Sequence, residues 1–342
     1  MADDKANALK SEIDEVKALA EIKEAKEKIL KEIGKVFIGQ LNVVEEVLYA
    51  LFAQGHVLLI GVPGLGKTLL VNSLAQLLSL QFNRVQFTPD LMPSDIVGTE
   101  ILEENSKTGD RNFKFVEGPI FTQILLADEI NRTPPKTQAA LLQAMQEREV
   151  TSSGNTYKLA KPFFVLATQN PIEQEGTYPL PEAQLDRFMF NIKIEYPPTD
   201  EEVLMVKATT GGGIPDLSSI LTQEQILKFQ DMVRLVPASD RIIKYAVSLT
   251  EATRPNREKS PDFVNSYVTW GAGPRASQYL ILGAKVRALL HGRFYAACED
   301  VRALAYAVLR HRIMINFNAE AEGITQDIII DKIIKAIPEP AS

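Results

Sequence analysis

The chain has 342 residues, a formal net charge of −7 and an ordinary globular composition, with 45% hydrophobic and 24% charged residues. This length suggests two domains, each able to bury its own core. The acidic balance argues against a broad nucleic-acid surface, and because no apolar run approaches the roughly 20 residues that span a bilayer, we expect no direct membrane insertion. The single cysteine, Cys298, excludes an intramolecular disulfide and predicts a buried small residue. With no secretory pattern at the N-terminus, these features predict a cytoplasmic protein.

Residues 6–33 predict one charged amphipathic helix that ends at Gly34. Its apolar residues recur at three- and four-residue steps: Leu9, Ile13, Val16, Leu19, Ile22, Ile29 and Ile33. This stripe fits either the protein's own body or a coiled-coil partner helix, and we expect the former. Asn42 with Glu45 then indicates the start of a second helix over residues 43–53.

The next segment, Gly61-Val62-Pro63-Gly64-Leu65-Gly66-Lys67-Thr68, follows the apolar run 56–60 and precedes a helical pattern. Its spacing, G-x-x-x-x-G-K-T between a strand and a helix, is typical of a P-loop. The glycines let backbone N–H groups surround a phosphate, the lysine reaches the β- and γ-phosphates, and the threonine can ligate Mg²⁺. The sequence therefore predicts nucleoside triphosphate binding by Gly61, Pro63, Gly64, Leu65, Gly66, Lys67, Thr68 and Leu69.

Strands and helices then alternate, which predicts an α/β fold. The expected elements are strand 56–60, helix 67–80, strand 82–87, strand 124–129, helix 134–148, strand 163–169, helix 181–187 and strand 188–195. Nearly continuous apolar runs at 124–127 and 163–167 are typical of parallel strands that helices cover on both faces. Two insertions interrupt the alternation. The first, 88–121, contains a strand-like piece at 113–116, and the second, 149–161, predicts a hairpin that turns at 153–155.

Pro197-Pro198 marks a boundary, after which helical periodicity dominates to the end. Thr199 with Glu202 predicts a helix start, 211–213 is a Gly-rich break, and Pro261 and the segment 271–274 separate later helices. We therefore expect three parts: an N-terminal helix over 1–34, an α/β nucleotide-binding core over 35–196, and a helical lid domain over 197–342.

Two carboxylates follow the buried run 124–127, about 60 residues after the P-loop. Because the carboxyl ends of parallel strands meet at one sheet edge, we expect Asp128 and Glu129 beside the P-loop. Asp128 would hold Mg²⁺, and Glu129 would act as general base on the attacking water. The alternative is that both acids only end a strand and pair with Arg132.

Three further polar residues are candidates for phosphate chemistry. Asn170 ends the strand 163–169, where its amide can hydrogen-bond the γ-phosphate and the water, although Asn170-Pro171 is also a common turn. Arg187 closes a helix before a strand and can act as an arginine finger toward a neighbouring subunit, or else pair with Asp186. Arg275 starts a helix in the second domain and can contact the γ-phosphate, or else be one basic residue of a solvated face.

This set of motifs, in this order, resembles the AAA+ ATPases: Walker A at 61–68, Walker B at 128–129, sensor 1 at Asn170, an arginine finger at Arg187 and sensor 2 at Arg275. The phrases 37–40, 56–68, 127–136, 139–148, 167–171 and 185–188 are similar to those of the MoxR family. The resemblance covers roughly residues 34–335 and identifies the insertions as a helix-2 insert and a pre-sensor-1 hairpin. It implies ATP and Mg²⁺ as cofactors, with Phe37, Ile38 and Gly39 lining the adenine pocket.

The family resemblance also implies a ring, usually hexameric, with ATP between subunits. Its typical partners are proteins with a von Willebrand factor A domain, and its role is chaperone-like remodelling or maturation of protein clients. A nucleic-acid motor remains an alternative, but the uncharged hairpin tip, 152–155, and the acidic chain argue against it, since such motors need cations there. An ATP-gated binding switch without turnover is a third reading, against which the intact pair Asp128 and Glu129 argues.

Overall fold

The structure is a computed structural model that describes residues 2–104, 111–152, 154–172, 176–211, 215–258 and 260–340, with side chains from residue 17 onward. The chain forms two compact units. The core unit comprises Val36–Val44 and Gln54–Gln223, and the helical unit comprises Met1–Lys35, Glu45–Ala53 and Glu224–Ser342. The three-part division expected from the sequence stays a prediction.

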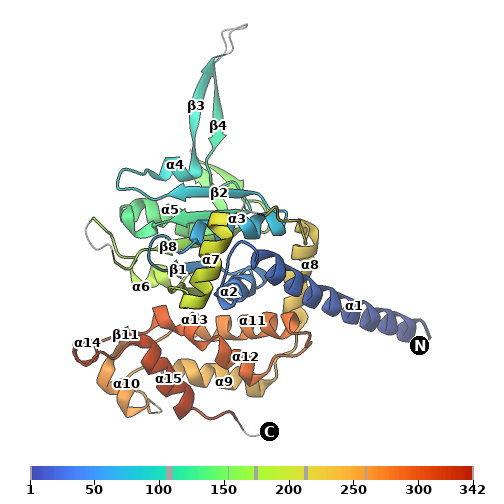
Figure 1. The fold of residues 1–342 in the computed structure, drawn as a ribbon, viewed down its shortest axis with the longest axis vertical. Coiled ribbons are helices and arrows are strands. Elements are labelled where there is room, and N and C mark those ends of the chain that lie inside the picture. Colours follow the sequence, from blue (N-terminus) through green and yellow to red (C-terminus); the bar gives the residue numbers. More distant parts are fainter. Residues whose placement is uncertain are drawn as a thin grey trace. The chain divides into compact units, whose positions relative to one another are not determined.

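The core unit contains a five-stranded parallel sheet with the strand order β2-β5-β8-β1-β9 (Figure 1). Its strands are β1 (Val57–Ile60), β2 (Phe82–Gln86), β5 (Ile124–Asp128), β8 (Phe164–Gln169) and β9 (Phe190–Lys193). The central strands β5 and β8 are almost wholly buried, which confirms the prediction from their apolar runs. The predicted α/β fold is therefore confirmed.

Helices cover this sheet. Helix α3 (Lys67–Leu77) packs against β5, and α5 (Pro135–Glu147) contributes Leu141, Leu142 and Met145 to a core cluster with side chains of β5 and β8. Helix α6 (Glu182–Leu185) is shorter than the expected helix 181–187, and the expected helix 43–53 is α2 (Leu41–Phe52). Because α2 begins one residue before Asn42, the prediction that Asn42 starts this helix was wrong.

Both insertions form hairpins. The first contains α4 (Pro93–Val97), β3 (Gly98–Glu104) and β4 (Arg111–Glu117), and its two strands pair and extend away from the sheet (Figure 1). The sequence indicated only part of β4. The second pairs β6 (Glu149–Ser152) with β7 (Asn155–Lys158), which confirms the predicted hairpin, although Ser153 of its turn lies outside the described residues. The ring of Phe115 stacks on that of Tyr157 with centroids 4.1 Å apart, so the two hairpins contact each other.

Helices α7 to α15 form most of the C-terminal part, as predicted: α7 (Thr199–Gly211), α8 (Gln223–Leu235), α9 (Asp240–Glu251), α10 (Asp262–Tyr267), α11 (Pro274–Leu290), α12 (Cys298–Ala303), α13 (Ala305–Leu309), α14 (Phe317–Ala321) and α15 (Gln326–Ala336). The sequence did not indicate the short pair β10 (Val268–Trp270) and β11 (Met314–Ile315). The expected Gly-rich break includes Gly212 and Gly213, which lie outside the described residues. Helix α11 packs against α9, α12 and α13.

The N-terminal helix α1 (Ala2–Ile33) packs against α11 of the same unit. Ile22, Ile29 and Ile33 are fully buried, so the expectation that this helix packs on the protein's own body is confirmed for its described side chains. Cys298 is buried at the start of α12, as expected. Within the described residues, no helix combines the length and the apolar composition that a membrane span requires.

Candidate functional site

The segment between β1 and α3 has the backbone of a phosphate-binding loop. Gly64 and Gly66 have φ angles of +86° and +74°, which residues other than glycine rarely adopt. No atom lies within 4 Å of the place that a Cβ on Gly64 would occupy, so the loop is open at this point. Helix α3 begins directly after Gly66, so its first N–H groups face the loop.

Lys67 folds back over this loop. Its Nζ donates hydrogen bonds to the carbonyl oxygens of Gly61 and Val62, the latter at 3.2 Å. Burial lowers the pKa of Lys67, whereas the nearby carboxylates of Asp128 and Glu129 favour its charged form. The ammonium group is thus held inside the loop. A bound anion would replace the carbonyl oxygens of Gly61 and Val62 as its acceptors, because a charged acceptor binds an ammonium group more strongly.

Parallel pairing brings the carboxyl ends of four strands together. Gln86 of β2 pairs with Asp128 of β5, Ala127 pairs with Ala167 of β8, and Ile60 of β1 pairs with Gln169. The strand tips that carry the acids, the amide and the P-loop are therefore neighbours, as predicted.

Asp128 is buried and bonded on both oxygens. Oδ1 accepts from the hydroxyl of Thr168 at 2.6 Å, and Oδ2 accepts from Nε and Nη2 of Arg84 at 3.1 and 2.7 Å. The hydroxyl of Thr168 also accepts from the backbone N–H of Glu129 at 2.8 Å. The fully buried Thr168 therefore fixes both acidic positions from the adjacent strand.

Glu129 follows the end of β5 with a φ of +57°, so the expected strand 124–129 ends one residue early. A non-glycine residue in this region is strained and is common at functional sites. Its Oε2 accepts from Nε2 of Gln86 at 2.7 Å and from Nη1 of Arg132 at 3.0 Å. The pairing with Arg132 that the alternative reading required is thus present for Glu129, whereas Asp128 binds Arg84 instead.

Asn170 directly follows β8 and is almost fully buried. Its Oδ1 accepts from the backbone N–H of Ile172 at 3.1 Å, the arrangement of a turn stabilised by an asparagine side chain. The backbone of Gly61 donates to Gln169 at 3.3 Å, which joins this turn to the start of the P-loop. The turn is therefore present and lies beside the loop, and the sensor role of Asn170 stays a prediction.

The two candidate arginines lie in different units. Arg187 follows α6 in the core unit, and its Nη1 donates to the carbonyl oxygen of Leu142 on α5 at 2.9 Å. Arg275 lies in the first turn of α11 in the helical unit. The roles of both residues toward the phosphates stay predictions.

The segment expected to line the adenine pocket lies at the P-loop. Ring carbons of the buried Phe37 come within 3.5 Å of the place that a Cβ on Gly66 would occupy. Gly39 has a φ of +79°, and the carboxylate of Glu201 fills the space where its Cβ would lie. The side chain of Gln40 exchanges two hydrogen bonds with the backbone of Glu195, at 2.7 and 3.0 Å, which holds this segment beside the end of β9.

A cavity of about 540 Å³ opens beside the first half of the P-loop. It is lined by Ile60, Gly61, Val62, Leu65, Pro171, Lys193, Ile194, Glu195 and Tyr196. Mostly apolar walls with a few polar groups suit the ring system of a ligand whose phosphates lie in the loop. The part contributed by 193–196 was not predicted as a site, although the Pro197-Pro198 boundary directly follows it.

Comparisons with known proteins agree with this geometry. A family model described as "ATPase family associated with various cellular activities (AAA)" matches residues 56–190, and one described as "AAA lid domain" matches residues 263–333. The chain is 44% identical to "Uncharacterized protein YeaC" of Bacillus subtilis over 92% of this chain and 94% of that protein. It is 41% identical to "Chaperone MoxR1" of Mycobacterium tuberculosis, over 92% and 82% of the two chains. The chain belongs to the MoxR family of AAA ATPases.

A solved structure supports the same membership over almost the whole chain. The crystal structure of a putative ATPase from Cytophaga hutchinsonii matches with a TM-score of 0.89 and 41% identity, covering 98% of this chain and 99% of that one. The MoxR-family resemblance inferred from the motifs is therefore confirmed, as are the AAA core and the helical lid.

In this MoxR-family ATPase, sequence reasoning missed two residues at the acidic end of β5. Arg84 and Thr168 bond directly to Asp128. Arg84 belongs to no motif that the sequence singled out, and Thr168 lies in the phrase 167–171 but was given no role. The available signal was weak: a charged residue in a short strand, and a threonine at the end of an apolar run. Among the described residues, no group of three or more His, Cys, Asp or Glu side chains gathers in a way that could hold a metal ion.

Proposed function

We propose that this chain is one subunit of a ring, hexameric as is usual in the family, that hydrolyses ATP with Mg²⁺ at subunit interfaces to remodel protein clients. The observation that carries the proposal is the shared position of Asp128, Glu129 and Asn170 at the carboxyl ends of β5 and β8, beside the strand that enters the P-loop. That is where a parallel sheet presents groups to a bound nucleotide.

The P-loop supplies the phosphate contacts. The N–H groups at the start of α3 and the ammonium of Lys67 would hold the β- and γ-phosphates, with Pro63, Leu65 and Leu69 shaping the loop. The hydroxyl of Thr68 and the carboxylate of Asp128 are hard oxygen donors, so these residues fit Mg²⁺. When bound, Mg²⁺ would neutralise charge on the phosphate oxygens.

Glu129 would orient the attacking water and take its proton. Gln86 and Arg132 both bond to Oε2 of this carboxylate, which leaves Oε1 for a water. Asn170 would bond the γ-phosphate, Arg187 would enter the site of a neighbouring subunit as a finger, and Arg275 would contact the γ-phosphate from the lid.

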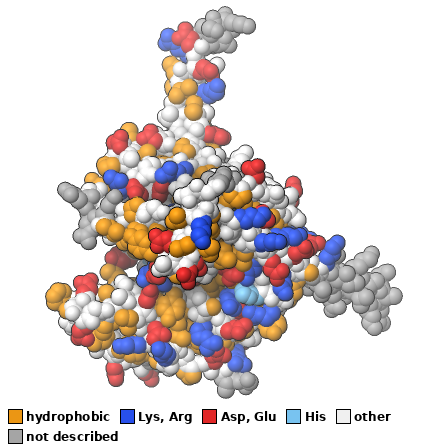
Figure 2. Space-filling view, viewed as in Figure 1, with side chains coloured by type: hydrophobic (Ala, Val, Ile, Leu, Met, Phe, Trp, Pro, Cys, Tyr) orange, Lys and Arg blue, Asp and Glu red, His pale blue; other side chains and the backbone are white. Residues whose placement is uncertain are grey.

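The partners follow from the family rather than from the site. "Chaperone MoxR1" is named as a chaperone, and we extend that role to this chain. The proposed partner is a protein with a von Willebrand factor A domain, and the proposed location is the cytoplasm. Basic and acidic side chains are interspersed on the face that Figure 2 shows, whereas a nucleic-acid motor would gather basic ones into a stripe.

The test is ATP hydrolysis per subunit against protein concentration, with Mg²⁺ and with the variant Lys67→Ala as the blank. A steep rise with concentration supports a site completed by a neighbour. Arg187→Ala should keep ATP binding and lose about 10³–10⁵ in turnover. Normal hydrolysis by this variant would contradict the finger assignment, and a rate equal to the blank at every concentration and with partner present would contradict the ATPase proposal.

A further inference from the structure

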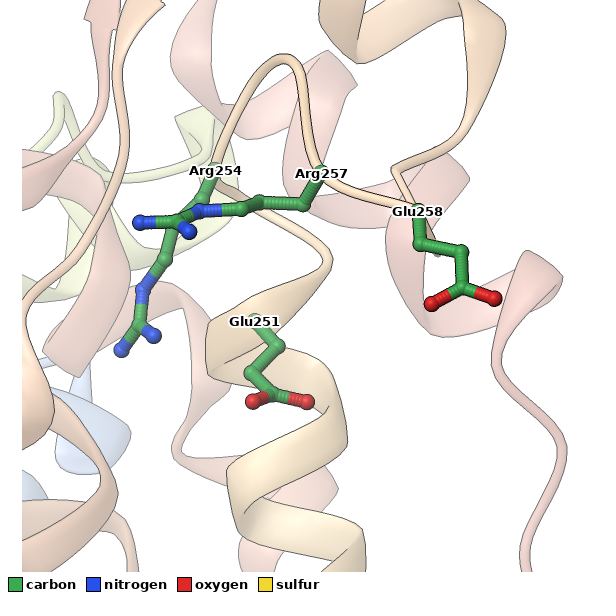
Figure 3. A pocket seen from close by; sticks show the side chains of 4 residues that line it. All are labelled: Glu251, Arg254, Arg257 and Glu258. Atoms are coloured by element: carbon green, nitrogen blue, oxygen red, sulfur yellow. The ribbon is translucent and has the colours of Figure 1, made fainter.

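The helical unit contains a second cavity, of about 440 Å³, in the loop between α9 and α10 (Figure 3). Its lining residues are Glu251, Arg254, Arg257 and Glu258. The volume falls within the range of small-ligand pockets, about 300–1,000 Å³. All four residues come from one stretch of eight residues, so the cavity exists within the helical unit by itself.

The two arginines carry charge that the rest of the unit leaves available. In Figure 3 both guanidinium groups extend to the same side of the loop, and the carboxylates of Glu251 and Glu258 lie apart from them. Within the ranges that the structure describes, no carboxylate forms an ion pair with Arg254 or Arg257. Two guanidinium groups in one pocket repel each other, and a planar fork of N–H donors binds a carboxylate or phosphate with two parallel hydrogen bonds.

Arg254 is also fixed to the segment that leads into α11. Its Nε donates to the carbonyl oxygen of Ala272 at 2.8 Å, and the backbone N–H of Ala272 donates to the hydroxyl of Thr253 at 2.8 Å. A Cβ on Gly271 would lie 2.3 Å from the carbonyl oxygen of Thr253, so only glycine allows this close approach. Because Thr253 and Ala272 are buried, water does not compete for the hydrogen bonds that join the two backbone segments. Helix α11 begins two residues later with Pro274 and Arg275.

We propose that Arg254 and Arg257 form an oxyanion-binding site and that the segment 271–275 senses its occupancy. Arg254 bonds Ala272 through Nε, so its two Nη atoms are the donors to the ligand. A ligand that attracts the guanidinium group therefore moves the same side chain that positions the start of α11. The ligand class is a phosphate or a carboxylate group. An effect of the bound anion on ATP turnover rests on the proposed role of Arg275, whereas binding of the anion to Arg254 and Arg257 does not.

The only tryptophan of the chain provides the reporter. Trp270 is 68% exposed and directly precedes Gly271, so its emission reports on the segment that Arg254 holds. The experiment is a titration of the full chain with sodium phosphate at constant ionic strength, followed by Trp270 fluorescence and by calorimetry. The parent chain carries Lys67→Ala, which removes phosphate binding at the P-loop. We expect saturable binding with a change in emission.

The variants separate the site from general charge effects. Arg257→Gln should weaken phosphate binding about tenfold, since one charge-assisted pair is lost. Arg254→Lys keeps the charge but not the fork, and should weaken both binding and the emission change. The matched control is Arg302→Gln, an exposed arginine of the same unit outside the cavity, which should titrate like the parent. Sodium acetate in place of phosphate tells a carboxylate ligand from a phosphate ligand.

The absence of saturable binding of either anion, or equal binding by the parent and Arg257→Gln, would overturn the site. Binding by calorimetry without a change in Trp270 emission would overturn the sensing. The same variants with Lys67 intact test turnover. If the anion binds but leaves the ATPase rates of the parent and of Arg257→Gln equal, the coupling of the site to ATP turnover is overturned, while the anion site stands.

Discussion

Two regions of the molecule pair carboxylates with arginines, and they do so in opposite surroundings. At the sheet edge, Asp128 binds Arg84 and Glu129 binds Arg132, and these arginine side chains are 46% and 42% exposed. The side chains of Asp128 and Glu129 are only 11% and 20% exposed, but water and salt compete for the half-exposed arginines, so we expect each pair to contribute about 1 kcal/mol to stability. The arginines can therefore leave without unfolding the protein.

In the helical unit, Asp300 is fully buried. It accepts from Arg293 at 2.6 and 2.8 Å, from Arg287, and from the backbone N–H of Ala297 at 2.9 Å. Burial alone would raise the pKa of Asp300, but these hydrogen bonds outweigh it, and the pKa lies below its ordinary value. An acid–arginine pair whose arginine is open to water suits the proposed exchange with ligands, whereas a pair closed to water suits a structural role.

The largest expected effect comes from a substitution in the exposed region, at the sheet edge. Glu129→Gln should lower ATP turnover about 10²–10⁴-fold, because the amide cannot take a proton from the attacking water. ATP binding should persist, so the ATP-bound protein should accumulate. Single-turnover hydrolysis and nucleotide retention measure the two effects.

The matched control for Glu129→Gln is Glu147→Gln, an exposed glutamate on α5 that accepts only from Gln143. Its turnover should equal that of the parent. Hydrolysis at the normal rate by Glu129→Gln would remove this residue from the role of general base.

The next largest effect comes from a substitution at the buried ion pairs of the helical unit. Asp300→Asn leaves two arginines without their buried acid, and loss of one partner of a buried pair costs about 3–5 kcal/mol. Urea unfolding followed by Trp270 fluorescence measures this loss in the helical unit. Asp331→Asn removes an exposed pair with Lys335 in the same unit and should cost less than about 1 kcal/mol. Equal losses for the two variants would contradict the comparison.

A buried histidine extends the comparison to pH. His56 of the core unit accepts from the N–H of Val165 at Nδ1, at 3.1 Å, so Nε2 carries the proton and donates to the carbonyl oxygen of Met145 at 3.1 Å. Burial lowers the pKa of His56 to about 4. The unfolded chain therefore binds more protons between about pH 6.5 and pH 4, and stability falls as the pH falls through this window.

This histidine accounts for a loss of about 3 kcal/mol across the full window. The variant His56→Gln can make the same two hydrogen bonds without titrating. We expect its free energy of unfolding to depend less on pH than that of the parent between pH 6.5 and 4. Parallel pH profiles for the two proteins would contradict this assignment.

A contrast between local and distant contacts explains which parts of the site could be predicted from the sequence. The P-loop depends on residues within one short segment, where glycines at set positions meet the local demand for positive φ. Asp128 and Glu129 were found because a buried strand ends at them. The partner Arg84 could not be found in this way, since its contact with Asp128 needs the pairing of β2 with β5 across 44 residues of chain.

Strand β3 was missed for a related reason. Only Ile101 and Leu102 are large apolar residues among its seven, and they are adjacent, so the alternation typical of a strand is absent. The strand forms because the next strand, β4, pairs with it along its whole length, and this pairing leaves no trace in the residue pattern of β3 itself. The half-buried hydrogen bond from Arg187 to the carbonyl oxygen of Leu142 likewise depends on tertiary packing between residues 45 apart.

The smallest expected effect comes from Arg84, and it compares the two arginines at the sheet edge with each other. Arg84→Gln removes an ion pair whose arginine is half-exposed, so the free energy of unfolding should change by about 1 kcal/mol. Arg84 binds Oδ2 of Asp128, the carboxylate that we propose for Mg²⁺, so the variant should remove a competitor and lower the Mg²⁺ concentration for half-maximal ATP hydrolysis, by about fivefold or less. Arg132→Gln is the matched control, because it pairs with Glu129 instead. A higher Mg²⁺ requirement for Arg84→Gln alone would mean that Arg84 positions Asp128 rather than competing for it.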